Sequence, residues 1–158
     1  MNTPRLSLLR KRASRLAAVQ AIYSELLIET ATLPALLAAQ MLERWADSRT
    51  YDTGDMLGDL QPEASLLNKL IAAVQHHRAD IDTAIATLIL PEWKRERMSL
   101  PLLATLTVFA AETLNAPTRS RATLIEEYTE VGAELLTDEE LSFAHKAFNL
   151  LLQQFRPA

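Results

Sequence analysis

The residue types best suited to chemistry near the start of the chain are cations, and the chemistry they favour is binding of a polyanion. Residues 1–24 contain no Asp or Glu but hold five basic side chains: Arg5, Arg10, Lys11, Arg12 and Arg15. Lys and Arg bind phosphate groups with release of counterions, so such a cluster on an ordered helix can hold nucleic acid in a salt-dependent way. The whole chain has a net charge of −4, and a basic end on an acidic body predicts a localised anion-binding surface.

Three of these cations are expected to be displayed together by a helix. Thr3 and Pro4 suit a helix start, Thr as N-cap and Pro in the first turn. At about 100° per residue, one face of this helix carries a core stripe, made of Leu9, Ala13, Leu16, Gln20, Tyr23 and Leu27. Lys11, Arg12 and Arg15 share an arc roughly 100° wide beside that stripe. We therefore expect them to face water side by side.

Charge alone leaves other interpretations of this stretch open. A basic segment at a chain start is as typical of a solvated helix face as of a binding surface. An Arg-rich, acid-poor segment is also typical of a transit peptide. The core periodicity continues past Glu25, which favours a helix of the folded domain over a targeting segment.

The other residues that could do chemistry do not form a catalytic or metal-binding pattern. There is no Cys, which excludes disulfides, thiolate metal sites and Cys nucleophiles. His76 and His77 are adjacent, so on a helix they diverge by about 100° and cannot chelate one ion. No phosphate-binding glycine loop, nucleophile elbow or zinc-protease pattern occurs. We expect no catalytic residue, metal or cofactor, and predict that the protein is not an enzyme.

Two further groups of residues are interpreted as structural. The acidic run of Glu126, Glu127, Glu130 and Glu134 is interpreted as a solvated helix face, because acid–base pairs need burial or a cleft to separate their pKa values. Trp45 and Trp93 could stack on bases, but in a helical protein they are more typical of the core or of loop anchors.

The elements that position these residues are all expected to be helices. The chain has 158 residues, of which 49% are hydrophobic and only 3 are Gly, so it can enclose a core with few tight turns. The segment over 62–91 reads as one helix or as two broken near His77, and the apolar segment after Ser99 predicts a central buried helix. We predict six or seven helices and no strand, with helices over 3–27, 34–47, 62–91, 100–114, 120–135 and 137–155 and a main loop near 48–61.

The expected location of the protein follows from what the chain lacks. No stretch approaches the roughly 20 apolar residues that a membrane-spanning helix requires. The absence of Cys is compatible with a reducing cytosol. We expect a soluble, cytoplasmic protein without a membrane partner.

Several segments in order resemble the NusB transcription antitermination family. "RASRLAAVQAIY" (12–23) is similar to the family's first-helix signature, and Glu112 matches the acid of its central helix. Three other segments resemble the third helix, the link that follows it and a later helix: "LLNKLIAAVQHHRADIDTAI" (66–85), "WKRERMS" (93–99) and "LIEEYTEV" (124–131). The resemblance covers essentially the whole chain.

This resemblance implies a fold and a function. The fold is a single all-helical domain over 1–158 built of two packed helical subdomains. The function is binding of the boxA element of ribosomal RNA leaders together with ribosomal protein NusE, in the transcription elongation complex. The RNA contacts of the family's first helix carry over onto Arg10, Lys11, Arg12 and Arg15, with Arg5 beside them.

The chain departs from the family pattern within 102–111 and 143–148. Leu102 and Leu103 stand where charged residues are usual, Ala111 replaces a Tyr, and the Asn-Gly of the closing helix is missing. Adjacent apolar residues in place of charges predict an exposed contact surface. We therefore take Leu102, Leu103 and Glu112 as candidate partner-binding residues. The alternative function is that of a diverged paralogue, a protein-interaction module or homodimer without antitermination activity.

Overall fold

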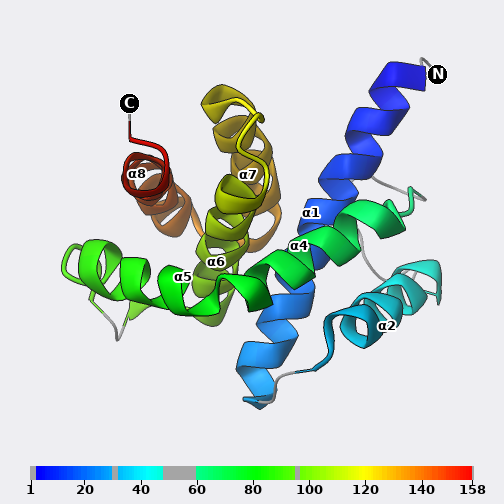
Figure 1. Cartoon of the computed structure of the whole chain (residues 1–158), viewed down its shortest axis with the longest axis horizontal. Helices are drawn as coiled ribbons and strands as arrows, with labels where there is room; N and C mark the ends of the chain where they lie inside the picture. The colour runs from blue at the N-terminus through cyan, green and yellow to red at the C-terminus, as the bar shows by residue number, and fades with distance from the viewer. Residues whose placement is uncertain (1–2, 30–31, 48–59, 95–96, 158) are drawn as a thin grey trace.

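Seven α-helices and a π-helical turn make up the described part of the chain, which in this computed structural model is residues 3–29, 32–47, 60–94 and 97–157 (Figure 1). No strand occurs within these ranges, so the predicted all-α class is confirmed. The predicted loop near 48–61 lies outside the described residues except for its last two positions. The elements are α1 (Thr3–Ile28), α2 (Pro34–Asp47), α4 (Ala64–His76), α5 (Arg78–Ala84), η1 (Ile85–Ile89), α6 (Leu100–Asn115), α7 (Arg121–Leu135) and α8 (Asp138–Phe155).

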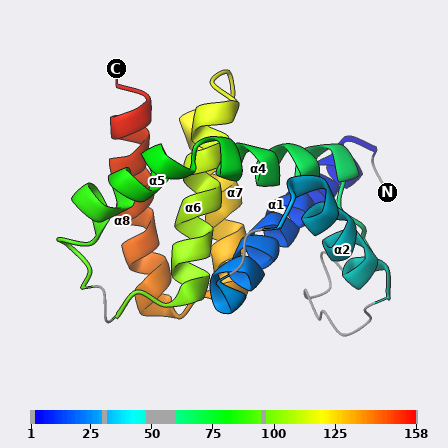
Figure 2. The same ribbon diagram turned by 60° about the horizontal axis from the view of Figure 1, so that its bottom comes forward.

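The helices pack in two groups that meet along α1, α4 and α6. In Figures 1 and 2, α1, α2 and α4 lie at one end of the molecule, and α6, α7 and α8 lie side by side at the other. The helix α6 packs against α1 and α4 of the first group and against α7 and α8 of its own. This arrangement agrees with the two packed helical subdomains that we expected.

The central position of α6 follows from its composition. It begins at the N-cap Ser99, whose hydroxyl accepts a hydrogen bond from the Leu102 amide, and its residues from 104 to 113 are all buried. The Phe109 ring stacks on Phe148 of α8, with centroids 4.3 Å apart, and meets Tyr128 of α7 edge-on at 5.3 Å. The prediction that this segment is the central buried helix is confirmed.

The buried surface of α1 is wider than the single core stripe that the sequence predicts for it. Every residue over 13–19 is buried, because α2, α4, α6 and α7 all contact α1. Small side chains permit this close approach, since Ala13, Ala17 and Ala18 are each 0% exposed. Toward its end the expected stripe fails, because Leu27 is 58% exposed.

The third predicted segment is divided at His77. The helix α4 ends at His76, α5 begins at Arg78, and the π-helical turn η1 continues to Ile89. Of the two interpretations left open, the one with a break near His77 is confirmed. The break lets the chain change direction over α6, which both α4 and α5 contact.

Helices suited to cross a membrane are absent from the described residues. None of the helices there combines the length and the apolar composition needed to cross a bilayer.

Candidate nucleic-acid interface

Arg15 is held inside the protein by two carboxylates. Its side chain is 2% exposed, and its Nε and Nη2 atoms each donate to a carboxylate oxygen of Glu112 at 2.9 Å. Its Nη1 atom donates to Glu127 at 3.3 Å. Tyr128 donates a further hydrogen bond of 2.6 Å to Glu112. Fork-shaped pairing of this kind satisfies a guanidinium that water does not reach, so Arg15 connects α1 to α6 and α7.

Arg12 also faces α7 rather than open solvent. Its Nε and Nη2 atoms donate to the two carboxylate oxygens of Glu127 at 3.2 and 2.8 Å, and its side chain is 14% exposed. The expectation that Lys11, Arg12 and Arg15 face water side by side is therefore wrong. The wheel projection treated the face beside the core stripe as free, whereas α6 and α7 cover it with Glu112 and Glu127.

The pKa shifts of Arg15, Glu112 and Arg12 all favour the charged form of the side chain. Burial alone would lower the pKa of Arg15, but the hydrogen bonds and charge of Glu112 raise it above its ordinary value. Burial likewise opposes the charged form of Glu112, and the hydrogen bonds from Arg15 nevertheless hold the pKa of that carboxyl below its usual range. The hydrogen bond with Glu127 raises the pKa of Arg12. All three groups therefore stay charged at neutral pH.

The other three cations that we predicted to bind RNA have no carboxylate partner among the described residues; they are Arg5, Arg10 and Lys11. Arg5 is exposed. Arg10 donates to the backbone carbonyls of Gln61 and Pro62 at 3.1 and 3.3 Å, which ties α1 to the segment before α4. Lys11 is half-buried and lines a pocket between α1, α4 and the turn after α6. RNA contact by these three cations stays a prediction.

Comparison with known proteins gives a family. The NusB family model matches residues 12–144, which is most of the chain. The chain belongs to the NusB family. Among curated relatives, the "Transcription antitermination protein NusB" of Maricaulis maris is 27% identical over 147 residues, which cover 93% of this chain and 88% of the relative. The protein of the same name from Hyphomonas neptunium is 29% identical over 138 residues, covering 86% and 84%.

A solved structure of NusB from T. maritima shares the fold. The two chains superpose with a TM-score of 0.70 at 20% sequence identity, and the match covers 99% of this chain and 96% of that one. The resemblance inferred from the ordered motifs is thereby confirmed, both as a family and as a NusB fold.

The candidate partner-binding residues of this NusB family member are mostly inside it. Leu102 is 0% exposed and Glu112 is 1% exposed, so neither can contact a partner directly. The prediction of two adjacent exposed apolar residues is wrong, because the departures at Leu102 and Ala111 are core positions of α6. Leu103 is half-buried and lines a groove with Leu26 and other residues of α5, η1 and α6. It alone of the three remains a candidate contact.

The acidic run on α7 is divided between surface and core. Glu126, Glu130 and Glu134 are exposed, as expected for a solvated face. Glu127 is 3% exposed and pairs with Arg12 and Arg15, which sequence reasoning missed. The available signal was spacing, because Glu127 lies three residues after Leu124 and four before Val131, on the apolar face of the helix. A carboxylate on the core side of a helix requires a cation there.

Trp45 and Trp93 occupy structural positions, as expected, and the histidines belong to no metal-binding group among the described residues. The described residues contain no group of three or more His, Asp or Glu that could hold a metal ion. His76 is exposed, and His145 contacts the Thr129 hydroxyl at 3.0 Å. Trp45 is buried with its indole N–H bonded to Gln20 at 2.9 Å, and Trp93 stacks on Phe143 with centroids 4.4 Å apart.

Proposed function

We propose that this protein is a non-catalytic, RNA-binding transcription antitermination factor. Its targets would be boxA-type elements of ribosomal RNA leaders, bound together with the ribosomal protein NusE. The observation that carries this proposal is membership of a family whose curated relatives, matched over most of their length, are named transcription antitermination proteins. The protein would act in the cytoplasm within the elongation complex.

The structure reduces the set of residues available for RNA. Arg15 is buried and Arg12 is bound to Glu127, so their charge supports the fold before any ligand arrives. Arg5, Arg10 and Lys11 retain donors that no carboxylate of the described chain occupies. We propose that these three supply the first helix's contribution to RNA binding.

Titration of boxA-type RNA at several salt concentrations tests this function. We expect binding that weakens as salt rises, because the cations release counterions from the phosphate backbone. Replacing Lys11 by Gln should reduce the slope of log K against log salt by about 0.7 for a single-stranded RNA. Added NusE should increase the affinity. RNA binding that is absent, or that does not depend on salt, contradicts the proposal.

A second candidate function is a protein-interaction module that associates with itself. The observation favouring it is a group of exposed apolar side chains near the α1–α2 connection, which includes Leu27, Ile28, Leu33 and Leu36, between 52% and 76% exposed. Light scattering separates the candidates. A monomer that binds RNA with NusE supports antitermination, whereas a concentration-dependent dimer without RNA affinity supports the interaction module.

A further inference from the structure

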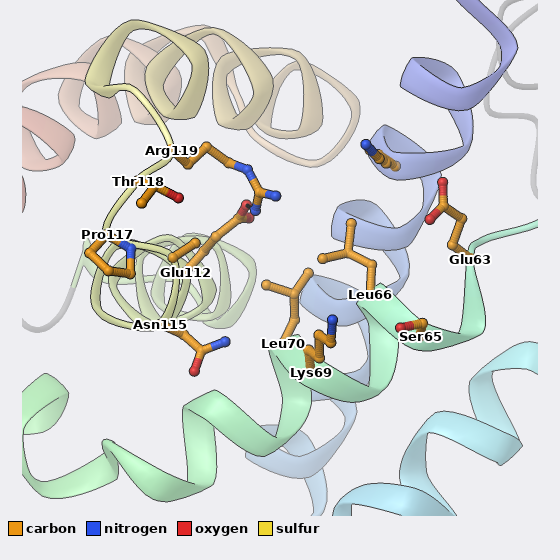
Figure 3. A pocket seen from close by; sticks show the side chains of 12 residues that line it. Glu63, Ser65, Leu66, Lys69, Leu70, Glu112, Asn115, Pro117, Thr118 and Arg119 are labelled. Atoms are coloured by element: carbon orange, nitrogen blue, oxygen red, sulfur yellow. Dashed lines mark hydrogen bonds and ion pairs between the residues drawn. The ribbon is translucent and has the colours of Figure 1, made fainter. Parts of the chain in front are cut away.

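A pocket between three elements gathers cations that come from distant parts of the sequence. It has a volume of about 530 Å³ and lies between α1, α4 and the turn that connects α6 to α7 (Figure 3). Lys11 enters its lining from α1, Lys69 from α4 and Arg119 from the turn. The fold therefore brings three cations from separate elements to the lining of one cavity.

The charge of these cations is only partly compensated. Neither Lys11 nor Lys69 forms an ion pair or side-chain hydrogen bond within the ranges that the structure describes, whereas Arg12 and Arg15 on the same first helix do. Arg119 donates to Glu112 at 2.6 Å through one nitrogen, Nη1. That carboxylate already receives two hydrogen bonds from Arg15. Arg119 is therefore the second cation that pairs with the Glu112 carboxylate, and its side chain is 32% exposed.

Neutral donors complete the lining on the same side. The Asn115 amide, at the end of α6, lies in Figure 3 across the hollow from Lys69, with Arg119 on the turn above it. The Thr118 hydroxyl also lines the pocket. A tetrahedral oxyanion accepts hydrogen bonds from several directions, and a mixture of Lys, Arg, amide and hydroxyl donors suits it.

The two carboxylates of the lining do not cancel this preference. Glu112 is 1% exposed and is matched by Arg15 behind it, with Arg119 in front. Glu63 lies on the far side of the hollow from Arg119 and Asn115, beyond Leu66, in Figure 3. An anion bound near the turn after α6 would therefore be attracted by the cations more than it is repelled by these two carboxylates.

We propose that this pocket binds a phosphate group, held by Lys69, Arg119 and Lys11 with hydrogen bonds from Asn115 and Thr118. The proposal rests on the RNA-binding function in so far as the phosphate belongs to an RNA strand. A free polyphosphate carries the same chemistry and is the other source. The site extends the anion-binding surface from the first helix to α4 and the α6–α7 turn, which the sequence did not indicate.

The first experiment compares two lysine variants in RNA binding. Lys69→Gln removes one cation from the pocket, and the matched control Lys94→Gln removes an exposed cation that does not line the pocket and lies in the segment before α6. Fluorescence anisotropy with a short single-stranded RNA at several salt concentrations gives the affinity of each variant. We expect Lys69→Gln to weaken binding about threefold to fivefold and to reduce the salt slope by about 0.7. We expect Lys94→Gln to match the parent chain.

A second experiment separates this site from the proposed function. Tripolyphosphate is titrated into the parent chain and into Lys69→Gln, and the backbone amide chemical shifts of Asn115, Ala116, Thr118 and Arg119 are followed by NMR. We expect shifts that saturate in the parent and that need a higher concentration in the variant.

The two experiments together give a distinct result for each case. RNA binding that Lys69→Gln leaves unchanged overturns the pocket and leaves the function standing. Tripolyphosphate shifts without any RNA binding support the phosphate site and contradict the function. Absence of both overturns both. An identical loss in Lys69→Gln and Lys94→Gln also overturns the site, because it would show only an effect of net charge.

Discussion

At the scale of single residues, Arg15 stabilises the fold through its buried carboxylate partners. Replacing it by Met would leave Glu112 in the protein interior with only Arg119 and Tyr128 as partners. Breaking a buried ion pair by removal of one partner costs about 3 to 5 kcal/mol. We expect Arg15→Met to lower the free energy of unfolding by that amount, as measured by urea denaturation.

The control for this prediction is the neighbouring guanidinium. Arg12 is 14% exposed and pairs with Glu127, which keeps Arg15 as a partner when Arg12 is lost. Arg12→Met should therefore cost less than Arg15→Met. Equal losses in the two variants would show that burial of the pair is not the source of the stability.

Residue types were predictable here, but their environments were not. The cations of the first helix and the acid Glu112 stand out in the sequence, and two of those cations, Arg12 and Arg15, form the observed network with Glu112 and Glu127. Whether a cation is buried depends on which helices pack around it, and α1 alone does not contain that information. The continuous run of buried residues over 13–19 includes Ala13, Ala17 and Ala18, which marks a helix that neighbours approach closely.

At the scale of elements, the start of α8 is fixed by reciprocal capping. The Thr137 hydroxyl accepts from the Glu140 amide at 3.2 Å, and the Glu140 carboxylate accepts from the Thr137 amide at 3.0 Å. Loss of an N-cap hydroxyl costs about 1 kcal/mol. We expect Thr137→Ala to lower the melting temperature by about 2 to 4 °C. Ser142→Ala, on an exposed position of the same helix, should leave it unchanged within error.

Boundaries of this kind could be predicted because they depend on neighbours in sequence. The helices predicted to begin at residues 100 and 137 begin there within one residue, with the hydroxyls of Ser99 and Thr137 as N-caps. The break at His77 was less certain, because no Gly or Pro marks it and the apolar periodicity runs through it. The helices on both sides of the break, α4 and α5, contact α6, and such contacts between helices cannot be read from the local sequence.

At the scale of the whole molecule, the distribution of charge matters more than its sum. The chain is acidic as a whole, yet Lys11, Lys69 and Arg119 line one pocket while exposed acids such as Glu126 and Glu130 lie on α7. A localised positive region on an acidic protein can still attract a polyanion and orient it. The sequence revealed the first-helix part of this region, and folding adds the parts from α4 and the α6–α7 turn.

The two helix groups are expected to unfold together, because they share a core across α1, α4 and α6. The buried apolar residues form a single cluster that runs from Leu9 to Leu152, and Arg15 joins α1 to α6 and α7 through buried ion pairs. The two tryptophans report on different groups, Trp45 on α2 and Trp93 on the segment before α6. In single-tryptophan variants, Trp45→Phe and Trp93→Phe, the fluorescence and circular-dichroism transitions in urea should coincide within each variant, as in two-state unfolding. A fluorescence midpoint that differs from the circular-dichroism midpoint would instead show that one group unfolds before the other, and the single domain that we predict would then be two.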